Sequence, residues 1–346
     1  MKKVIKEFIP QGGKHCITNS LKQIFTYYGY PLSEEMMFGL ASGLSFLYLN
    51  QSNSPMINGR TKVFEFEKKL AERLNITIKC KSGSDYKQIN QITKNMIDKG
   101  DPVLIYVDMP YLKYLGLNEN SHFGGHAVVL YGYDDITENY WISDRDNHDF
   151  IIRTPYGNIA QDNHLVSYQE VEKARSSSYK PFPAKNKYLI FNFNGYRQIE
   201  QMVLIEAIKE TCNSMLNPPA KLLGVDGIMK FSKEILKWRN YSTDKLKLSG
   251  TTNYFQISKD GGTGGGIFRK MYGDFLLEAA TILKDEKIAL IGNQFLEVSK
   301  SWDEIADYMW KLSLSADTTL LNQMSTQILE IYSKEVTLYQ YLQKII

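Results

Sequence analysis

The sequence predicts an α+β fold in two domains: an N-terminal domain with an antiparallel sheet, followed by a mainly α-helical domain. Three observations lead to this prediction. The length of 346 residues exceeds what a single hydrophobic core usually fills. In the first half, helical spacing of apolar residues gives way near residue 102 to runs of β-branched and aromatic residues. Beyond about residue 195 the spacing is helical almost to the end.

The first predicted helix spans residues 17–28. Its apolar residues recur at helical spacing, and Gly29 and Pro31 end it. Residues 134–139 read as a hairpin connection between two strands, so the sheet is expected to be antiparallel. The other elements expected in this half are helices at 63–74 and 86–97 and strands at 76–80, 102–107, 126–133, 140–143 and 188–191.

The domain boundary is expected near residue 195. Residues 175–187 are rich in Ser, Pro and basic residues, which marks a loop or linker, but the strand at 188–191 returns to the first sheet. The predicted domains are therefore 1–195 and 196–346. A glycine-rich loop at 260–266 interrupts the second domain, whose helices are expected at 197–215, 220–238, 267–283, 302–314 and 318–341.

Composition argues against several classes of function. Lys and Arg number 41 against 38 Asp and Glu, and a net charge of +3 gives little attraction for nucleic acid. The longest mostly apolar run, residues 36–49, has about 14 residues where a membrane span needs roughly 20. Glu7 and Pro10 interrupt the first ten residues, so no secretion signal is expected. Three cysteines without CxxC spacing predict reduced thiols and a cytoplasmic protein.

Three residues form a candidate catalytic set. Cys16 begins the first helix, where the helix dipole favours a thiolate, although a small buried core residue is the plain alternative. His126 begins a strand and Asp144 follows the next one, so a base and an orienting carboxylate are expected to meet. Asp134 and Asp146 remain alternatives for that carboxylate. Gln11 is a candidate amide donor to an oxyanion beside the Cys16 N–H.

The order Cys, His, Asp is that of papain-like enzymes, and longer motifs carry a family resemblance. HCITNSLKQIFTYYG at 15–29, LSEEMMFGL at 32–40 and HAVVLYGYDD at 126–135 resemble the N-terminal domain of the BtrH-type acyltransferase of butirosin biosynthesis. DGGTGGGIFR at 260–269 and YGDFLLEAA at 272–280 resemble the helical domain DUF4872 that accompanies it. More distantly, the first domain is similar to bacteriocin-processing C39 cysteine peptidases, which implies a papain-like (C39-like) fold.

This resemblance implies an acyltransferase that uses Cys16 as nucleophile, His126 as base and Asp144 as orienter. The acyl donor would be a phosphopantetheine thioester on an acyl carrier protein, and the acceptor a small amine. No bound cofactor is expected. Peptidases usually carry glycine after the cysteine, whereas Ile17 stands here, which makes a wide peptide-binding cleft less expected.

Further contacts with substrate are expected from His15 and Gly125, the chain neighbours of Cys16 and His126. Thr263 or Arg269 would touch the substrate or the pantetheine phosphate if the glycine-rich loop closes over the Cys16 cleft. The alternative is a tight turn that needs positive φ. No metal site is expected, because Gly124 and Gly125 prevent a helix that would align His122 with His126.

Two other classes of function stay open. A cysteine peptidase or amidase would pass the acyl group to water instead of an acceptor. A non-catalytic module would bind a carrier protein or a metabolite and keep its function after Cys16→Ala.

Overall fold

The structure is a computed structural model that describes residues 1–51, 53–62, 64–118, 121–145, 152–154, 157–159, 164–180 and 182–346. The chain forms two compact units. The first, the sheet unit, contains Met1–Glu34 and Asn75–Tyr196, and the second, the helical unit, contains Glu35–Leu74 and Arg197–Ile346. One crossing between the units lies at Tyr196–Arg197, and residues 35–74 group with the helical unit. The domains 1–195 and 196–346 stay a prediction.

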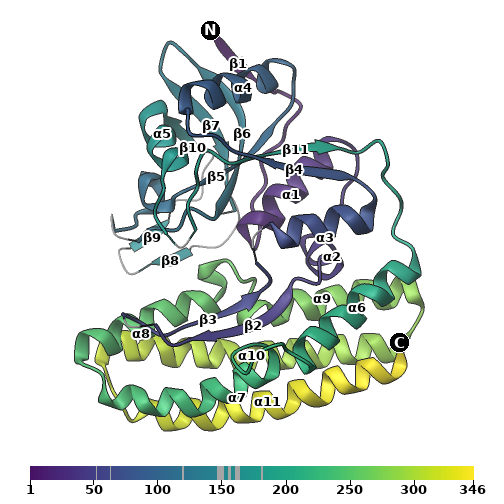
Figure 1. Cartoon of the computed structure of the whole chain (residues 1–346), viewed down its shortest axis with the longest axis vertical. Helices are drawn as coiled ribbons and strands as arrows, with labels where there is room; N and C mark the ends of the chain where they lie inside the picture. The colour runs from purple at the N-terminus through teal and green to yellow at the C-terminus, as the bar shows by residue number, and fades with distance from the viewer. Residues whose placement is uncertain are drawn as a thin grey trace. The chain divides into compact units, whose positions relative to one another are not determined.

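The sheet unit is built on an antiparallel sheet, which confirms the predicted α+β class (Figure 1). Within the described ranges this sheet has seven strands. Six strands lie in one row and form five neighbouring pairs, and β1 pairs with β6 outside this row. All of these pairs are antiparallel. The strands in the row are β10 (His164–Ser167), β7 (Asn139–Ser143), β6 (His126–Asp134), β5 (Val103–Val107), β11 (Tyr188–Asn192) and β4 (Thr77–Lys81), with β1 (Lys2–Val4) beside β6. A separate pair consists of β8 (Ile152–Thr154) and β9 (Gly157–Ile159).

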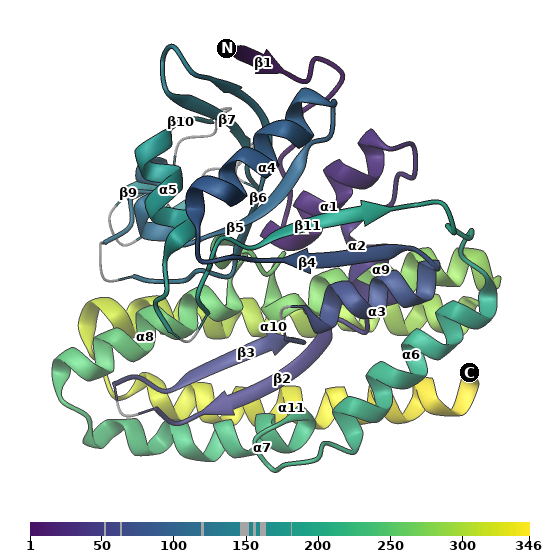
Figure 2. The same ribbon diagram turned by 45° about the horizontal axis from the view of Figure 1, so that its top comes forward.

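Helices α1 (Cys16–Tyr27) and α4 (Tyr86–Asp98) cover opposite faces of this sheet. Ser143 of β7 donates a hydrogen bond to Gln23 of α1, whereas Tyr140 of the same strand donates one to Asn90 of α4. Side chains three residues apart on a strand point to opposite faces, which places the two helices on either side. Figure 2 shows α4 crossing over β5 and β6. The unit also contains α5 (Tyr168–Ser176) and two short 3₁₀ helices, η1 (Met109–Tyr111) and η2 (Lys113–Leu115).

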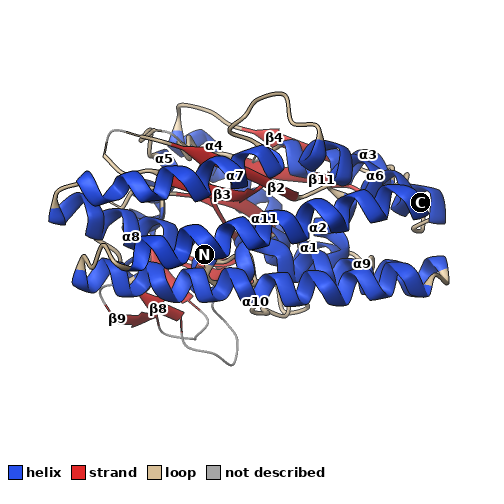
Figure 3. Ribbon diagram, turned by 90° about the horizontal axis from the view of Figure 1, so that it is seen from below, coloured by secondary structure: helices blue, strands red, loops and turns tan. Residues whose placement is uncertain are grey.

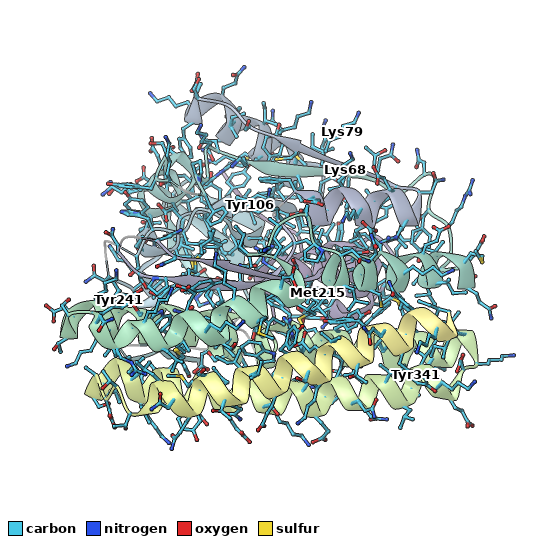
Figure 4. All side chains as sticks on the ribbon, turned by 60° about the horizontal axis from the view of Figure 1, so that its bottom comes forward. Lys68, Lys79, Tyr106, Met215, Tyr241 and Tyr341 are labelled. Carbon is cyan, nitrogen blue, oxygen red and sulfur yellow. The ribbon has the colours of Figure 1, made fainter. Side chains whose placement is uncertain are left out.

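The sheet has a buried centre and an exposed edge. Tyr106 lies in β5, where every residue is buried, whereas Lys79 lies in the edge strand β4 and is exposed (Figure 4). Runs buried on both faces are expected for central strands, and a lysine on an edge strand discourages pairing with another chain.

The helical unit combines long helices with a two-stranded hairpin. Its longest helices, α10 (Glu286–Ser315) and α11 (Leu320–Ile345), pack side by side (Figure 3). The hairpin pairs β2 (Leu44–Leu49) with β3 (Met56–Arg60) and was not predicted. The remaining elements are α2 (Glu34–Leu40), α3 (Glu65–Leu74), α6 (Gln201–Leu216), α7 (Gly224–Glu234), η3 (Ile235–Asn240), α8 (Thr243–Ile257), η4 (Lys259–Gly261), η5 (Gly266–Phe268) and α9 (Arg269–Leu283).

The backbone of the β2–β3 hairpin forms hydrogen bonds with other parts of the helical unit. Asn253 of α8 accepts a hydrogen bond from the Ile57 N–H at 2.9 Å and donates one to the Pro55 carbonyl at 2.9 Å. The Tyr48 N–H donates to the Leu222 carbonyl at 2.9 Å. The apolar run at 36–49 therefore supplies α2 and β2, which pack against helices of the same unit.

In the ranges that the structure describes, no helix combines the length and apolarity that a membrane crossing requires.

Candidate active site

Cys16 is the first residue of α1, as the sequence predicts. His15 precedes it as the N-cap residue with extended backbone angles, φ −133° and ψ 136°. The N–H groups of the first helical turn have no partner within the helix, so they place partial positive charge next to the Cys16 side chain. Ser20, one turn later, donates to the Ala127 carbonyl at 3.2 Å. This bond fixes the start of α1 beside the start of β6, where His126 stands.

His126 and Asp144 form a buried pair. The hairpin between β6 and β7 pairs Val129 with Ser143, so the start of β6 and the end of β7 lie at the same edge. His126 Nε2 lies 2.7 Å from Asp144 Oδ2, and both side chains are at most 3% exposed. Tyr114 donates to the same carboxylate oxygen at 2.8 Å. The predicted contact between this histidine and this carboxylate is therefore present.

The two other carboxylates that the sequence leaves open have different outcomes. Asp134 lies at the far end of β6, where it accepts a hydrogen bond from the Ile136 N–H at 2.9 Å. Asp146 lies outside the described residues. Of the carboxylates that are described, Asp144 is the one that contacts His126.

The charges of the site favour an ion pair between Cys16 and His126. Burial raises the pKa of the Cys16 thiol. The nearby His15 and His126 rings lower this pKa by charge and hydrogen bonding, and their effect is the larger one, so the net pKa is well below its ordinary value. Burial also opposes the charged form of His126, yet the Asp144 carboxylate outweighs it and raises the His126 pKa to about 10. The Asp144 pKa is depressed despite burial, because His126 and Tyr114 stabilise the carboxylate.

Two polar side chains of α1 hold the segment that precedes Cys16. Gln23 Oε1 accepts hydrogen bonds from the Gln11 N–H at 3.0 Å and from the Ser143 hydroxyl at 2.7 Å. Asn19 donates to the Gln11 carbonyl at 3.0 Å. Gln11 is thus fixed by its backbone, and within the described ranges its side chain makes no hydrogen bond. Its role as an oxyanion donor stays a prediction.

Asn19 and Gln23 belong to the site but were not predicted from the sequence. Both are buried, and they lie four residues apart on one face of α1. Two amides at this spacing in a helix that is largely buried are the signal that points to them, because buried polar groups need partners.

Glu34, at the start of α2, is a third residue of the site that was not predicted. Its carboxylate accepts hydrogen bonds from the Lys14 N–H at 2.9 Å, the His15 N–H at 3.1 Å and the Thr18 hydroxyl at 2.6 Å. It is 4% exposed. This carboxylate satisfies backbone donors just ahead of α1 and so helps to set the position of Cys16. No local sequence pattern connects Glu34 to residues 14–18.

Two residues predicted to contact substrate, His15 and Gly125, directly precede the nucleophile and the base in the chain. The His15 ring is buried and hydrogen-bonds the Cys16 side chain. Gly125 is buried immediately before β6, and a side chain there would lie 3.0 Å from the Phe123 ring. Contacts of His15 and Gly125 with a substrate stay predictions.

Thr263 and Arg269 bond inside the helical unit. The Thr263 hydroxyl lies 2.7 Å from the Ile257 carbonyl and accepts from the Gly265 N–H at 3.1 Å. Arg269 forms a fully buried ion pair with Glu335, Nε to Oε1 at 2.8 Å. Contact of either side chain with a substrate or the pantetheine phosphate stays a prediction.

The glycine-rich segment is a sharply bent turn. The φ angles of Gly262, Gly264, Gly265 and Gly266 are 82°, 71°, 104° and 54°, in the region that favours glycine. A side chain at Gly266 would meet the Cα of Ser299 at 2.5 Å. These angles match the tight-turn alternative. Closure over Cys16 stays a prediction.

No group of three or more metal-ligating side chains gathers among the described residues. His122 and His126 bond to different carboxylates, because His122 Nδ1 lies 2.9 Å from Asp108 Oδ2. Of the two other cysteines, Cys80 is exposed and Cys212 is buried.

Comparison with known proteins identifies two family models in this chain. The model described as "Butirosin biosynthesis protein H, N-terminal" matches residues 15–145, which include Cys16, His126 and Asp144. The model of the domain of unknown function DUF4872 matches residues 169–342. A search of the curated proteins finds no match.

Proposed function

Because the chain belongs to the BtrH-type family, matching its N-terminal domain over residues 15–145 and DUF4872 over 169–342, we propose that it is a cysteine-dependent acyltransferase of secondary metabolism. It moves an acyl or aminoacyl group from the phosphopantetheine thioester of an acyl carrier protein to a small amine. The N-terminal family takes its name from butirosin biosynthesis. The chemistry assigned here rests on the site itself, because one fold supports many reactions.

One observation carries this proposal: Cys16 stands at a helix N-terminus beside a histidine that a buried carboxylate orients. Asp144 occupies His126 Nε2, which leaves Nδ1 as the ring nitrogen for the hydrogen bond with Cys16. This order of carboxylate, imidazole and thiol produces an activated sulfur nucleophile at neutral pH. The same order supports the papain-like assignment of the first domain.

In the first step the Cys16 thiolate attacks the carbonyl carbon of the carrier thioester. The new carbon–sulfur bond to Cys16 forms as the bond to the pantetheine sulfur breaks. His126 gives its Nδ1 proton to the departing pantetheine thiolate, and the developing oxyanion lies near the Cys16 N–H. The products are the acyl-enzyme, a free pantetheine thiol and a neutral His126.

In the second step the acceptor amine attacks the acyl carbon. His126, now neutral, takes a proton from the attacking nitrogen. The carbon–sulfur bond to Cys16 breaks as the amide forms, and the thiolate and imidazolium are restored. A buried site favours this outcome, because water competes with the amine for the acyl-enzyme.

The proposal is tested by measuring the intact mass of the protein after incubation with a panel of acyl-pantetheine thioesters. We expect a mass increase equal to the acyl group, which peptide mapping places on Cys16, and its loss when an acceptor amine is added. Cys80→Ser is the matched control, because Cys80 is an exposed thiol that can acylate without catalysis. Cys16→Ala should abolish both the adduct and the amide product.

Two results would replace the proposal. Loss of the acyl group to water at the same rate with and without amine would identify a hydrolase, the peptidase or amidase class. Failure of every thioester to acylate Cys16, with carrier binding unchanged in Cys16→Ala, would identify a non-catalytic binding module.

A further inference from the structure

Cys16 has a second histidine beside it. His15 precedes the nucleophile in the chain, and its ring, 4% exposed, hydrogen-bonds the Cys16 side chain from the N-cap position. The His126 ring approaches the same sulfur from β6. Both imidazoles therefore interact with the same sulfur.

A buried chain of polar groups sets the orientation of the His15 ring. Thr18 Oγ1 lies 3.5 Å from His15 Nδ1 and donates its proton to Glu34 Oε2 at 2.6 Å. Since the hydroxyl proton points to the carboxylate, the lone pairs of the oxygen face the ring and favour a proton on Nδ1. Nε2 is then the nitrogen available to the sulfur. The His15 N–H also donates to Glu34, so ring and backbone are held by one carboxylate.

We propose that His15 is a second catalytic imidazole, which stabilises the Cys16 thiolate while His126 carries the proton, with Thr18 and Glu34 as its positioning residues. The two histidines divide the work. His126 exchanges a proton with the leaving thiol and the attacking amine, whereas His15 stabilises the negative charge of the sulfur before it attacks the thioester and again as it leaves the acyl carbon. This inference rests on the proposed function for its catalytic meaning, but its electrostatic part concerns Cys16 alone.

The pH dependence of Cys16 alkylation by iodoacetamide tests the electrostatic part, with the label quantified on the Cys16 peptide. Below its pKa, a cysteine reacts in proportion to its thiolate fraction. Removing one adjacent positive charge shifts a pKa by about 1 to 3 units, so His15→Gln should slow alkylation at pH 6 about tenfold or more. In a background that lacks His126, His15 should still lower the Cys16 pKa. The Cys16 pKa should therefore be lower in His126→Ala than in the double variant His15→Gln/His126→Ala.

Recovery at high pH separates an electrostatic role from a damaged fold. At a pH high enough for Cys16 to ionise without a neighbouring charge, the alkylation rate of His15→Gln should lie within about twofold of that of the unchanged protein. A misfolded variant should not show this recovery. Acyl transfer by His15→Gln should recover in the same range, whereas transfer by His126→Ala should not, because that variant lacks the proton carrier.

Thr18→Val tests the positioning chain, because it keeps the shape of threonine and removes the hydroxyl. We expect Thr18→Val to raise the apparent pKa of Cys16 alkylation and Thr18→Ser to restore it. The control is Thr26→Val, the same substitution at an exposed position of α1.

Identical alkylation profiles for His15→Gln and the unchanged protein would overturn the inference, as would identical profiles for His126→Ala and the double variant. Both results concern alkylation only. They are distinct from failure of the proposed function, which would appear as absence of a Cys16 adduct with acyl thioesters.

Discussion

Among single residues, the carboxylate that bonds one ring nitrogen of His126 controls the charge of the candidate site. Asp144 holds Nε2 of His126, and the Tyr114 hydroxyl and the Arg145 N–H bond to the same carboxylate at 2.8 and 2.6 Å. A buried carboxylate with three hydrogen-bonding partners remains ionised and keeps the imidazole protonated. The charged form of the imidazole is therefore favoured next to Cys16 before any substrate arrives.

Cys16 should be the most reactive of the three thiols at mildly acidic pH. Its pKa is well below the ordinary value, whereas burial raises the pKa of Cys212 to about 12. We expect iodoacetamide at pH 6 to label Cys16 first, although Cys80 is the exposed cysteine. Peptide mass spectrometry at low extents of labelling measures the order. Faster labelling of Cys80 would show that Cys16 is not the activated thiol.

Removing the charge of Asp144 should lower the pKa of His126. The carboxylate raises that pKa to about 10, and the neutral amide of Asp144→Asn keeps a hydrogen bond but not the charge. We expect a fall of about 1 to 3 units, so the imidazolium is lost at lower pH. NMR titration of the His126 ring measures it. Tyr114→Phe should change the pKa less, and an unchanged value in Asp144→Asn would contradict the assigned cause.

At the scale of elements, helix α1 connects the parts of the site. Its polar face contacts the segment before Cys16 through Asn19 and Gln23, the strand β6 through Ser20, and the end of β7 through Ser143. Each of these hydrogen bonds is buried or partly buried. Moving an element away from α1 would leave a buried polar group without a partner, which costs free energy, so these bonds hold the elements in place.

The sequence predicts α1, β6 and β7 well because their patterns are local. Helical spacing ends at Gly29, and the turn at 134–139 sets the hairpin that brings His126 to Asp144. The contacts of Glu34 with Lys14 and His15 are not predictable in this way, because they join residues 19 and 20 positions apart across a turn. The β2–β3 hairpin was missed because the apolar run at 36–49 supplies both α2 and β2, so neither period dominates it, and because the hairpin's partners lie some two hundred residues later.

Gly13→Ala should disturb the segment that carries Cys16. A Cβ at Gly13 would lie 2.4 Å from Glu34 Oε1 and 2.5 Å from Asn19 Oδ1, two side chains that hold this segment. We expect a loss of about 1–3 kcal/mol in the free energy of unfolding and slower alkylation of Cys16. Denaturant unfolding and labelling measure both. Gly83→Ala is the control, because its Cβ would meet only the Ile89 side chain, at 3.1 Å. Equal effects of the two substitutions would refute this explanation.

At the scale of the whole molecule, the chain passes between its two units more than once. It leaves the sheet unit at Glu34, forms residues Glu35–Leu74 in the helical unit, and returns at Asn75 before leaving again at Tyr196. Apolar side chains of the 35–74 segment pack on later helices: Phe38 stacks on Phe268 at 5.4 Å, and Phe46 contacts Trp302 at 5.8 Å. A cut at residue 196 therefore separates partners of one hydrophobic core.

We expect a fragment of residues 1–196 to aggregate when it is expressed alone. It would retain the 35–74 segment without α7, α9 and α10, and buried side chains such as Phe38, Phe46 and Ile57 would face water. Co-expression with residues 197–346 should restore a soluble complex with Cys16 reactivity, because it supplies the missing half of the core. Solubility, size-exclusion chromatography and alkylation of Cys16 measure these outcomes. A soluble monomeric 1–196 fragment that labels Cys16 like the full chain would show instead that the sheet unit and the 35–74 segment need no helical partner.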